Sequence, residues 1–407
     1  MMIQVNEERI KREFAELTAI DSLSYGERRM ADRLTEKLKE LGFQVEEDDA
    51  AGTLKTEREL FQMQSGDSEK PSAVQGQERN LPAGNLYGFL KGTLPGTPIL
   101  LLAHMDTVRP GYGKKAVFHE DGRITGSGDT VLGADDAAGL VEILEGIRCM
   151  QEMGLAHRDI EILFPAAEEV HCRGSAVFDY SRIRAKEAYV FDLSGPVGTA
   201  AVQAPSILTF EATMIGKAAH AGFAPEDGIH AIAAMCEAVS RISQGRSAAG
   251  TEKETTLNIG SIHGGMATNV VPAACSCIGE IRSCSHAHAM EMAEYVREIF
   301  ENTAAQRGAE CEVNFRVNIT AYKTDTKEAV VRRFQKVCEG LSLPGNLITT
   351  FGGSDNNNLA QHGISGIVVS CGMCDVHSVR ESVRVEDLVT GARLAAGLLS
   401  IDELSII

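Results

Sequence analysis

The sequence predicts an α/β fold, in which a mixed, mostly parallel sheet carries helices on both faces and a second domain interrupts it. Short apolar segments at 99–103, 160–164 and 188–191 alternate with helical patterns, and such continuous apolar runs are typical of parallel strands covered on both faces. Between 205 and 319 the order changes to a split β-α-β-β-α-β unit. A chain of 407 residues also exceeds the usual size of one hydrophobic core, so two domains are expected.

The N-terminal part predicts two amphipathic helices. Apolar residues recur at helical spacing over 10–17 and again over 30–41, and Gly42 fits a C-terminal helix cap. A strand is expected at 43–45. Residues 46–84 are polar and have no sustained periodicity, so we expect a long surface excursion there, partly mobile and of little functional weight.

The remaining elements of the first domain follow from apolar runs and turn signals. A strand is expected at 85–90, and a turn rich in Gly and Pro leads from it into the apolar strand at 99–103. A glycine-rich loop precedes a helix at 137–150 with apolar residues at periodic positions. Buried strands are expected again at 160–164 and 188–191, which places these strands and helices in one α/β sheet.

The inserted domain is expected to hold four strands and two helices. In chain order they are a strand at 207–215, a helix at 228–242, strands at 256–262 and 274–281, a helix at 286–305 and a strand at 310–319. A helix at 327–341 and an apolar strand at 367–370 then return to the first pattern. The expected boundaries are 1–204 and 320–407 for the discontinuous first domain and 205–319 for the insertion.

Charge and composition exclude several partners and compartments. Asp and Glu total 57 against 39 Lys and Arg, a formal charge of −18, whereas nucleic-acid binding needs clustered basic residues. The N-terminus shows no secretory signal, and the longest core-like apolar stretch is far too short to span a bilayer. The ten cysteines are scattered and do not have disulfide-framework spacing, which favours a reducing cytoplasm.

Acidic residues or histidine follow the expected strands, at the edge where an open parallel sheet binds its ligands. They are His104 and Asp106, Asp135 and Asp136, Glu168 and Glu169, Asp192, and His377. A single carboxylate at a strand end is usually a helix cap or a solvated loop residue, but five such sites in one chain indicate a shared function. Converging carboxylates repel one another unless cations neutralise them, so the set predicts two divalent metal ions. Histidine and carboxylate ligands suit Zn²⁺, with Co²⁺ or Mn²⁺ as alternatives.

Two other motifs are interpreted as structural rather than functional. Cys371 and Cys374 form a CxxC pair, but no second pair accompanies it, so small buried hydrophobic residues are favoured over half a zinc site. The glycine-rich segment 126–133 lacks the Lys-Ser/Thr ending of a phosphate-binding loop, and its acids would repel phosphate.

The motifs HxDT, GADD, EE, D and H occur in this order, with the inserted domain between the fourth and the fifth. They resemble the dinuclear zinc family of aminoacylases, carboxypeptidase G and peptidase T. The stretches GADDAAG, PAAEEVHCRGS and GGSDNNNL point to the peptidase T branch, the tripeptide aminopeptidases. The resemblance covers nearly the whole chain outside 46–84. It implies a zinc-exopeptidase-like catalytic domain and a ferredoxin-like insertion that acts as a lid and a dimerisation domain.

The resemblance also implies a role for each strand-end residue. The implied ligands are His104 and Asp192 for one metal, Glu169 and His377 for the other, and Asp135 as the bridge between them. Asp136 stays a helix-start carboxylate. Asp106 would orient the imidazole of His104, and Glu168 would be the general base that moves a proton from water to the leaving amine. The family often has Lys where Ala137 stands, so a charge contact beside the site is missing here.

In the inserted domain the resemblance singles out His220, in GKAAHAG. The matching family histidine reaches the site of a neighbouring subunit and stabilises the tetrahedral oxyanion, so a homodimer through this domain is expected. Asn269 and Arg282 stand where the family binds the substrate's backbone or carboxylate, and the fork of Arg suits a carboxylate. Gly353 and Ser354 belong to a small-residue loop that a peptide can approach closely.

The sequence therefore predicts a cytoplasmic dizinc exopeptidase that removes the N-terminal residue of short peptides, tripeptides in particular. Two alternatives stay open: an amidohydrolase of N-acyl or N-carbamoyl amino acids with the same metals, and a non-catalytic binding protein of the same fold. Glu168 argues against the last alternative, because a non-catalytic metal site does not need an unliganded carboxylate.

Overall fold

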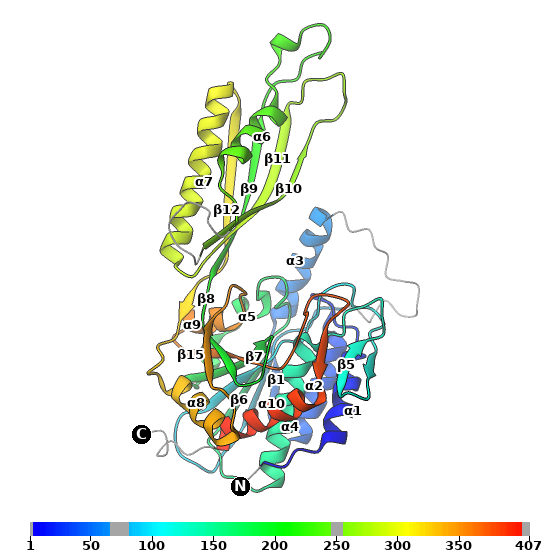
Figure 1. Cartoon of the computed structure of the whole chain (residues 1–407), viewed down its shortest axis with the longest axis vertical. Helices are drawn as coiled ribbons and strands as arrows, with labels where there is room; N and C mark the ends of the chain where they lie inside the picture. The colour runs from blue at the N-terminus through cyan, green and yellow to red at the C-terminus, as the bar shows by residue number, and fades with distance from the viewer. Residues whose placement is uncertain (1–2, 66–80, 246–254, 401–407) are drawn as a thin grey trace. The chain divides into compact units, whose positions relative to one another are not determined.

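The computed structural model describes residues 3–65, 81–245 and 255–400 (Figure 1). The chain divides into a main unit of Met1–Val202, Lys323–Thr349 and Ser354–Ile407, and an inserted unit of Gln203–Tyr322 and Thr350–Gly353. In the described part of the chain, no helix combines the length and the apolar character that a membrane crossing requires.

A mixed sheet, with nine strands among the described residues, forms the centre of the main unit. The strands are β1 (Gln44–Glu47), β2 (Leu86–Leu90), β3 (Ile99–Leu102), β6 (Ile160–Phe164), β7 (Glu187–Leu193), β8 (Thr199–Ala204), β13 (Tyr322–Lys323), β14 (Asn346–Thr349) and β15 (Ser365–Ser370). Their order is β1-β2-β6-β3-β7-β15-β8-β13, and β14 pairs with β8. The neighbours β6, β3, β7 and β15 run parallel. Their carboxyl ends therefore meet at one edge, and the predicted α/β class is confirmed.

Helices cover this sheet. They are α1 (Glu7–Thr18), α2 (Arg28–Glu40), α3 (Ala50–Ser65), α4 (Ala134–Glu152), α5 (Arg173–Val177), α8 (Ala329–Leu341), α9 (Asn356–Gln361) and α10 (Val385–Ser400). Helix α4 lies against β3 and β7, and both α1 and α10 pack on α4. The approach of α4 and α10 is close, because a Cβ on Gly146 would lie 2.7 Å from the Cβ of Ala395. Helix α4 thereby fixes the loop that precedes it against the centre of the sheet.

The polar excursion is more regular than the sequence predicts. Helix α3 occupies its first part, an element that the missing periodicity over 46–84 does not predict. Ala50 and Leu54 are buried and Glu57 pairs with Arg173, whereas the residues between Ala50 and Leu54 are solvated to a greater extent. Because only these few positions of α3 are buried, its sequence has no sustained helical repeat of apolar residues. The rest of the excursion, 66–80, lies outside the described residues.

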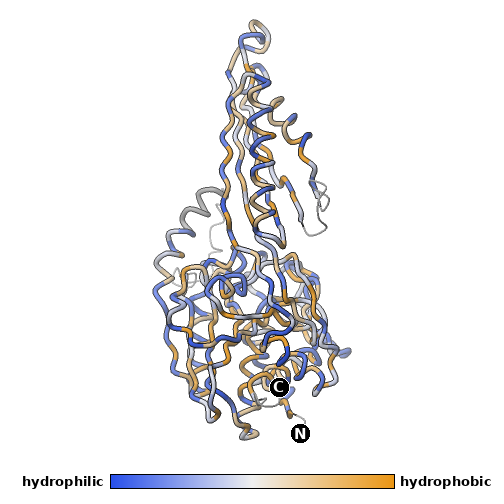
Figure 2. Tube along the Cα trace, turned by 90° about the vertical axis from the view of Figure 1, so that its left-hand side faces the viewer, coloured by the Kyte–Doolittle hydropathy of each residue, from blue (hydrophilic) through white to orange (hydrophobic). Residues whose placement is uncertain are grey.

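The inserted unit has the predicted strand and helix order. Its elements are β9 (Ser206–Ile215), α6 (Ala231–Arg241), β10 (Thr255–Gly264), β11 (Ala274–Ser283), α7 (His286–Arg307) and β12 (Glu310–Ile319). The antiparallel sheet has the order β10-β11-β9-β12. Alternate residues of β9 are buried in the core with α6 and α7, and Figure 2 shows hydrophobic and hydrophilic positions alternating along these strands. This is the split β-α-β-β-α-β arrangement that the sequence predicts.

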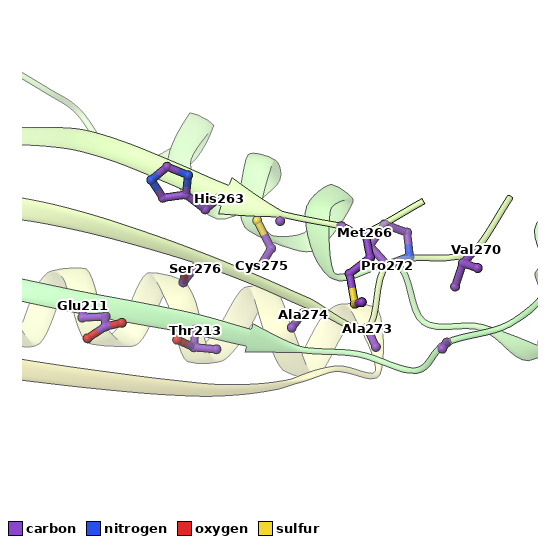
Figure 3. Close-up of a pocket in the computed structure, with 13 residues that line it drawn as sticks. Glu211, Thr213, His263, Met266, Val270, Pro272, Ala273, Ala274, Cys275 and Ser276 are labelled. Atoms are coloured by element: carbon purple, nitrogen blue, oxygen red, sulfur yellow. The ribbon is translucent and has the colours of Figure 1, made fainter. Parts of the chain in front are cut away.

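A groove of about 470 Å³ lies in the inserted unit (Figure 3). Glu211 and Thr213 of β9 lie at one end, and Met266 and Val270, from the connection between β10 and β11, lie at the other. The groove therefore combines polar and apolar walls on one small domain.

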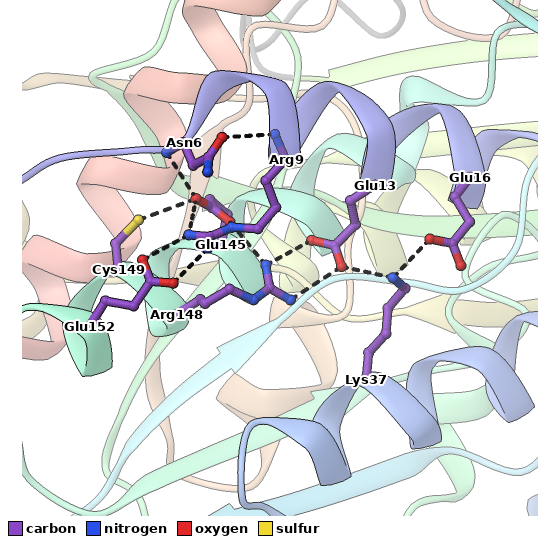
Figure 4. Close-up of polar contacts among 9 residues, drawn as sticks. All are labelled: Asn6, Arg9, Glu13, Glu16, Lys37, Glu145, Arg148, Cys149 and Glu152. Atoms are coloured by element: carbon purple, nitrogen blue, oxygen red, sulfur yellow. Dashed lines mark hydrogen bonds and ion pairs between the residues drawn. The ribbon is translucent and has the colours of Figure 1, made fainter.

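A chain of ion pairs joins α1, α2 and α4 in the main unit (Figure 4). Arg9 donates to Glu145 at 2.7 Å, and Arg148 bridges Glu145 (2.9 Å) and Glu13 (3.2 Å). Lys37 of α2 completes the chain with a bond to Glu13 at 2.8 Å. The Glu145 side chain is fully buried, so its negative charge and its two oxygens need these donors.

A separate three-stranded sheet lies near the glycine-rich loop. It pairs β4 (Ala116–Phe118) with β5 (Arg123–Gly126) and β5 with β16 (Ser382–Arg384), all antiparallel. Strands of three or four residues carry no recognisable alternation, so the sequence does not predict them. The sheet joins the segment before Asp135 to the segment after His377.

Candidate metal centre

The strand-end residues lie together because their strands are parallel neighbours. His104 and Asp106 follow β3, Glu168 and Glu169 follow β6, Asp192 lies in β7, and His377 follows β15. Asp135 and Asp136 stand at the start of α4, where they interrupt the helical backbone. The cluster thus gathers side chains from distant parts of the sequence at the carboxyl edge of the sheet.

The five predicted metal ligands form one connected series of contacts. His104 Nε2 lies 3.0 Å from Asp135 Oδ1 and 3.7 Å from Asp192 Oδ1. His377 Nε2 lies 3.2 Å from Asp135 Oδ2 and 2.9 Å from Glu169 Oε2. Asp135 therefore presents one carboxylate oxygen to each histidine, which is the arrangement a bridging ligand needs.

Asp136 shows why neighbouring carboxylates have different uses. Its Oδ1 or Oδ2 lies close enough to His104 and Asp192 to form a possible ligand group. However, Asp136 Oδ2 accepts the backbone N–H of His104 (3.0 Å) and Oδ1 accepts that of Gly139 (3.1 Å). These two bonds occupy both oxygens of Asp136 at a helix start, as is typical of a structural carboxylate.

The donor set fits divalent cations. His104, Asp135 and Glu169 offer ligand atoms within 4.8 Å of one another. Among the described residues, Glu169 Oε1 is a buried oxygen without a hydrogen-bond partner. An unsatisfied buried carboxylate oxygen is costly, and a cation would satisfy it. Imidazole and carboxylate together suit Zn²⁺ or a related metal.

The electrostatics of the protein without metal support this fit. Burial and the neighbouring Asp135 raise the pKa of Glu169 to about 8, and burial raises the pKa of Asp192 to about 6. Burial also opposes ionisation of Asp135, but hydrogen bonds from His104 and His377 outweigh it and lower the pKa of Asp135. Hydrogen bonds to Asp135 and Glu169 raise the pKa of His377 to about 10. The cluster thus retains protons where cations would otherwise balance its carboxylates.

Asp106 holds the segment that carries Glu168. Its Oδ1 accepts the backbone N–H of Glu168 (2.9 Å), and its Oδ2 accepts the N–H of Glu169 (3.2 Å) and the hydroxyl of Ser24 (2.7 Å). The same Oδ1 lies 3.4 Å from Nδ1 of His104. Asp106 therefore connects the first predicted ligand with the predicted general base. Burial and the charge of Asp192 raise the pKa of Glu168 well above its usual value.

Two buried acids that the sequence analysis missed support the same loops. Glu381 accepts the N–H of Gly133 at 2.7 Å and that of Asp135 at 2.9 Å. Glu27 accepts the N–H of Ala167 at 3.2 Å, directly before Glu168. The sequence signal is weak, since each acid contacts a backbone group more than a hundred residues away.

His220 and Asn269 lie together in the inserted unit. Residues His220 and Val270 form an antiparallel bridge, and Ala221 donates its N–H to the carbonyl of Asn269 at 3.0 Å. Nδ1 of His220 accepts the backbone N–H of Gly222 (3.1 Å) and of Phe223 (3.2 Å). These bonds assign the ring proton to Nε2, which is then a donor. Val270 also lines the groove, so the groove begins next to this histidine.

The other predicted substrate residues have defined local partners. The guanidinium of Arg282 is bound to Glu280 (2.6 Å) and to the carbonyl of Phe351 (2.8 Å). Gly353 packs so tightly that a Cβ would lie 1.9 Å from Ile319 Cδ1. Ser354, in the main unit, is buried, and its hydroxyl has no hydrogen-bond partner among the described residues. Arg282 is thus already paired with one carboxylate in this structure.

Comparisons with known proteins agree with the architecture. A family model described as a peptidase dimerisation domain matches residues 203–308, and one described as peptidase family M28 matches residues 85–209. The uncharacterised protein YqjE of Bacillus subtilis is 34% identical over 97% of this chain and 98% of its own length.

Two solved structures are similar over the same extent. A tripeptidase from Staphylococcus aureus is 30% identical with a TM-score of 0.87, and aminopeptidase PepT from Bacillus cereus is 33% identical with a TM-score of 0.83. Each alignment covers 97% of this chain and 98% of the other chain. With its strand-end cluster and its inserted unit, the chain belongs to the peptidase T-like metallo-aminopeptidases, a branch of the dinuclear aminoacylase and carboxypeptidase G type of family.

Proposed function

We propose that this protein is a dinuclear metal-dependent exopeptidase that removes the N-terminal residue of short peptides, tripeptides in particular. The observation that carries the proposal is the position of Glu168. It follows β6 directly beside Glu169, yet within the described residues it forms no hydrogen bond or ion pair with the two histidines of the cluster, whereas Glu169 pairs with His377. A carboxylate beside a metal centre that is not used as a ligand is suited to proton transfer. The names of the related tripeptidase and aminopeptidase support peptides as substrates.

We assign two metal positions to the cluster. His104 and Asp192 would hold one ion, Glu169 and His377 the other, and Asp135 would bridge them, as its contacts with both histidines suggest. Zn²⁺ is the proposed metal, with Co²⁺ or Mn²⁺ as alternatives. When bound, such ions lower the pKa of water and polarise the scissile carbonyl.

Glu168 and Asp106 complete the proposed catalytic group. Glu168 would accept the proton of the attacking water and later donate it to the leaving amine. Asp106, whose oxygens hold the backbone of Glu168 and Glu169, would also orient His104 through Nδ1. Asp106 would thus fix the positions of the general base and of a metal ligand relative to each other.

The inserted unit would supply the remaining substrate contacts. His220 offers an Nε2–H donor, as oxyanion stabilisation requires, and we propose that it acts in the site of the partner in a homodimer. Asn269, Arg282, Gly353 and Ser354 are proposed to bind the peptide backbone or its carboxylate. Because Arg282 is paired with Glu280, carboxylate binding would require an exchange of partners. The scattered cysteines support the cytoplasm as the proposed location.

A substrate panel tests the proposal. Zn²⁺-loaded protein is incubated with di-, tri- and tetrapeptides, the same tripeptides with a blocked amine, and N-acyl and N-carbamoyl amino acids, and products are identified by mass spectrometry. We expect release of the N-terminal residue from free tripeptides only. Glu168→Ala should keep about two metal ions per chain and lose nearly all turnover. Intact free tripeptides would remove the peptidase proposal, and cleavage of the acylated compounds alone would favour an amidohydrolase.

A further inference from the structure

A series of hydrogen bonds connects the Glu168 side chain to the GGSDNNNL run at 352–359. The run continues into α9, and α9 lies against α5, which begins directly after Cys172. This inference rests on the proposed function, since its subject is the proposed general base. The contacts lie entirely within the main unit.

The thiol of Cys172 donates to the carboxylate of Glu168. Its Sγ lies 3.2 Å from Glu168 Oε1, and it is the one hydrogen-bond donor to that carboxylate among the described residues. Cys172 is 1% exposed and Glu168 is 8% exposed, so water competes little for this bond. Burial raises the pKa of Cys172, so the sulfur keeps its proton and remains a donor.

Asn358 holds the backbone of Cys172. Its side-chain amide donates to the carbonyl of Cys172 at 3.2 Å and to the hydroxyl oxygen of Ser175 at 2.8 Å. Ser175 in turn donates its hydroxyl to the buried carboxylate of Asp355. Both amide hydrogens of Asn358 are therefore used, which fixes the orientation of its amide. The Ser175 hydroxyl also lies 3.2 Å from the carbonyl of Cys172, so both side chains contact the backbone of Cys172.

The backbone of the Glu168 segment is held by hydrogen bonds that do not involve the thiol of Cys172, including one from the Cys172 N–H to the Glu168 carbonyl at 2.7 Å. Glu27 accepts the N–H of Ala167, and Asp106 accepts those of Glu168 and Glu169. A glutamate side chain nevertheless retains its own rotamer freedom on a fixed backbone. Proton transfer requires the carboxylate to lie within about 2.6–3.2 Å of its partner, so this freedom lowers turnover.

We propose that Cys172 is a positioning residue for the general base. Its thiol holds one oxygen of Glu168 and leaves the other oxygen for proton transfer, while Asn358 fixes Cys172 in turn. The GGSDNNNL run thereby acts on catalysis through the orientation of a carboxylate.

The test compares Cys172→Ala, Cys172→Ser and a matched control. Cys149 is the control, because its buried thiol donates to Glu145 at 3.3 Å with the same spacing of four residues, remote from the metal cluster. Wild type and the three variants, with Cys149→Ala as the control, are compared in kcat, KM, metal content and thermal unfolding, on whichever substrate the wild type cleaves.

We expect Cys172→Ala to lower kcat about tenfold, with KM and two metal ions per chain unchanged, and Cys172→Ser to restore most of kcat because its hydroxyl also donates. Cys149→Ala should leave kcat unchanged. If Cys172→Ala kept the wild-type kcat, or if Cys172→Ser were as slow as Cys172→Ala, the positioning role would be wrong. Loss of metal or of folding in both Cys172 variants would reveal a structural role instead.

An infrared measurement keeps the inference separate from the choice of substrate. The S–H stretching band of Cys172, isolated by subtraction of the Cys172→Ser spectrum, should lie at the lowered frequency of a hydrogen-bonded thiol. It should return to the free-thiol frequency in Glu168→Ala. An S–H band that stays unchanged in Glu168→Ala would overturn the inference, whether or not the protein cleaves peptides. Absence of peptide cleavage, by contrast, would refute only the proposed function.

Discussion

Adjacent carboxylates at the centre differ in their partners, and the partners set their chemistry. Glu169 faces His377 at 2.9 Å, whereas Glu168 receives the Cys172 thiol at 3.2 Å. Asp135 faces two histidines, whereas Asp136 is occupied by two backbone N–H groups. At the residue scale, a carboxylate with backbone donors is a structural group, and one that faces imidazoles is a candidate ligand.

The raised pKa values at the centre predict pH-dependent metal binding. In the metal-free protein, Asp192 and Glu169 have pKa values of about 6 and about 8, so both bind protons at acidic pH. A cation must displace these protons and the proton of His377, whose pKa is about 10, so metal affinity rises with pH up to about 10 and through the whole interval from 6 to 8. Competition of Zn²⁺ with a chelator at several pH values measures the affinity, and we expect a change of up to about tenfold per pH unit for each proton released.

Glu169→Gln serves as the control for this prediction. The amide of the variant has no proton to release, so its Zn²⁺ affinity should change less steeply with pH above pH 6. Because the variant also lacks one charged ligand, it should bind Zn²⁺ more weakly than the wild type at each pH. A wild-type affinity that did not change between pH 6 and 8 would contradict the proposed ligand set.

At the scale of elements, the chain of ion pairs that joins α1, α2 and α4 fixes the N-terminal helices to α4. Helix α1 has predicted apolar positions on α4, but its polar edge also enters the interface through Arg9 and Glu13. The buried Glu145 accepts from both Arg9 and Arg148. Removing this buried acceptor takes a carboxylate from two cations at once, and each cation keeps only its other partner, Glu152 or Glu13. The loss therefore costs more than the loss of a surface pair.

Glu145→Ala should therefore destabilise the main unit by about 2–3 kcal/mol, somewhat less than a fully buried pair because Arg9 is partly exposed. Glu152→Ala removes an exposed partner of the same Arg9 and should cost less than about 1 kcal/mol. Urea denaturation followed by circular dichroism measures both variants. Equal losses in the two variants would show that burial of Glu145 does not decide its contribution.

The elements also show what the sequence could predict. The sequence predicts apolar strands such as β6 from a continuous run of apolar residues, and amphipathic helices such as α1 from the helical spacing of their apolar residues. Helix α10 and the three-residue strands were not, because α10 is apolar on most sides and the strands are too short for a period.

At the candidate site, strand-end reasoning selected residues that the structure brings together, although their roles as ligands stay predictions. Glu381, Glu27 and Cys172 could not be found this way. Each acts through one or two hydrogen bonds to groups whose proximity only the folded chain creates, or through a thiol that sequence patterns treat as a small hydrophobic residue.

For the whole molecule, the proposed chemistry is divided between two units. In the described residues the metal cluster belongs to the main unit, and His220 belongs to the inserted unit. If His220 acts in the partner's site, each active site of a dimer uses two chains.

Subunit mixing tests this division. His220→Ala and Glu168→Ala should each be nearly inactive alone, but a mixture after exchange of subunits should regain activity. In the mixed dimer one site combines an intact Glu168 from one chain with an intact His220 from the other. Turnover of a tripeptide and the mass of the species in solution are measured. A mixed dimer without recovered turnover would place His220 in the site of its own chain, and a His220→Ala variant that kept its activity alone would place His220 outside catalysis.

The order of the proposed ligands along the chain has a consequence for synthesis in the cell. His104, Asp135, Glu169 and Asp192 are translated before the inserted unit, but His377 follows it. Strand β15, which pairs with β7, also arrives late. At about 5–20 residues per second, the inserted unit is synthesised a few seconds before His377 completes the centre. A nascent chain therefore carries no complete peptidase site that could attack other peptides emerging nearby.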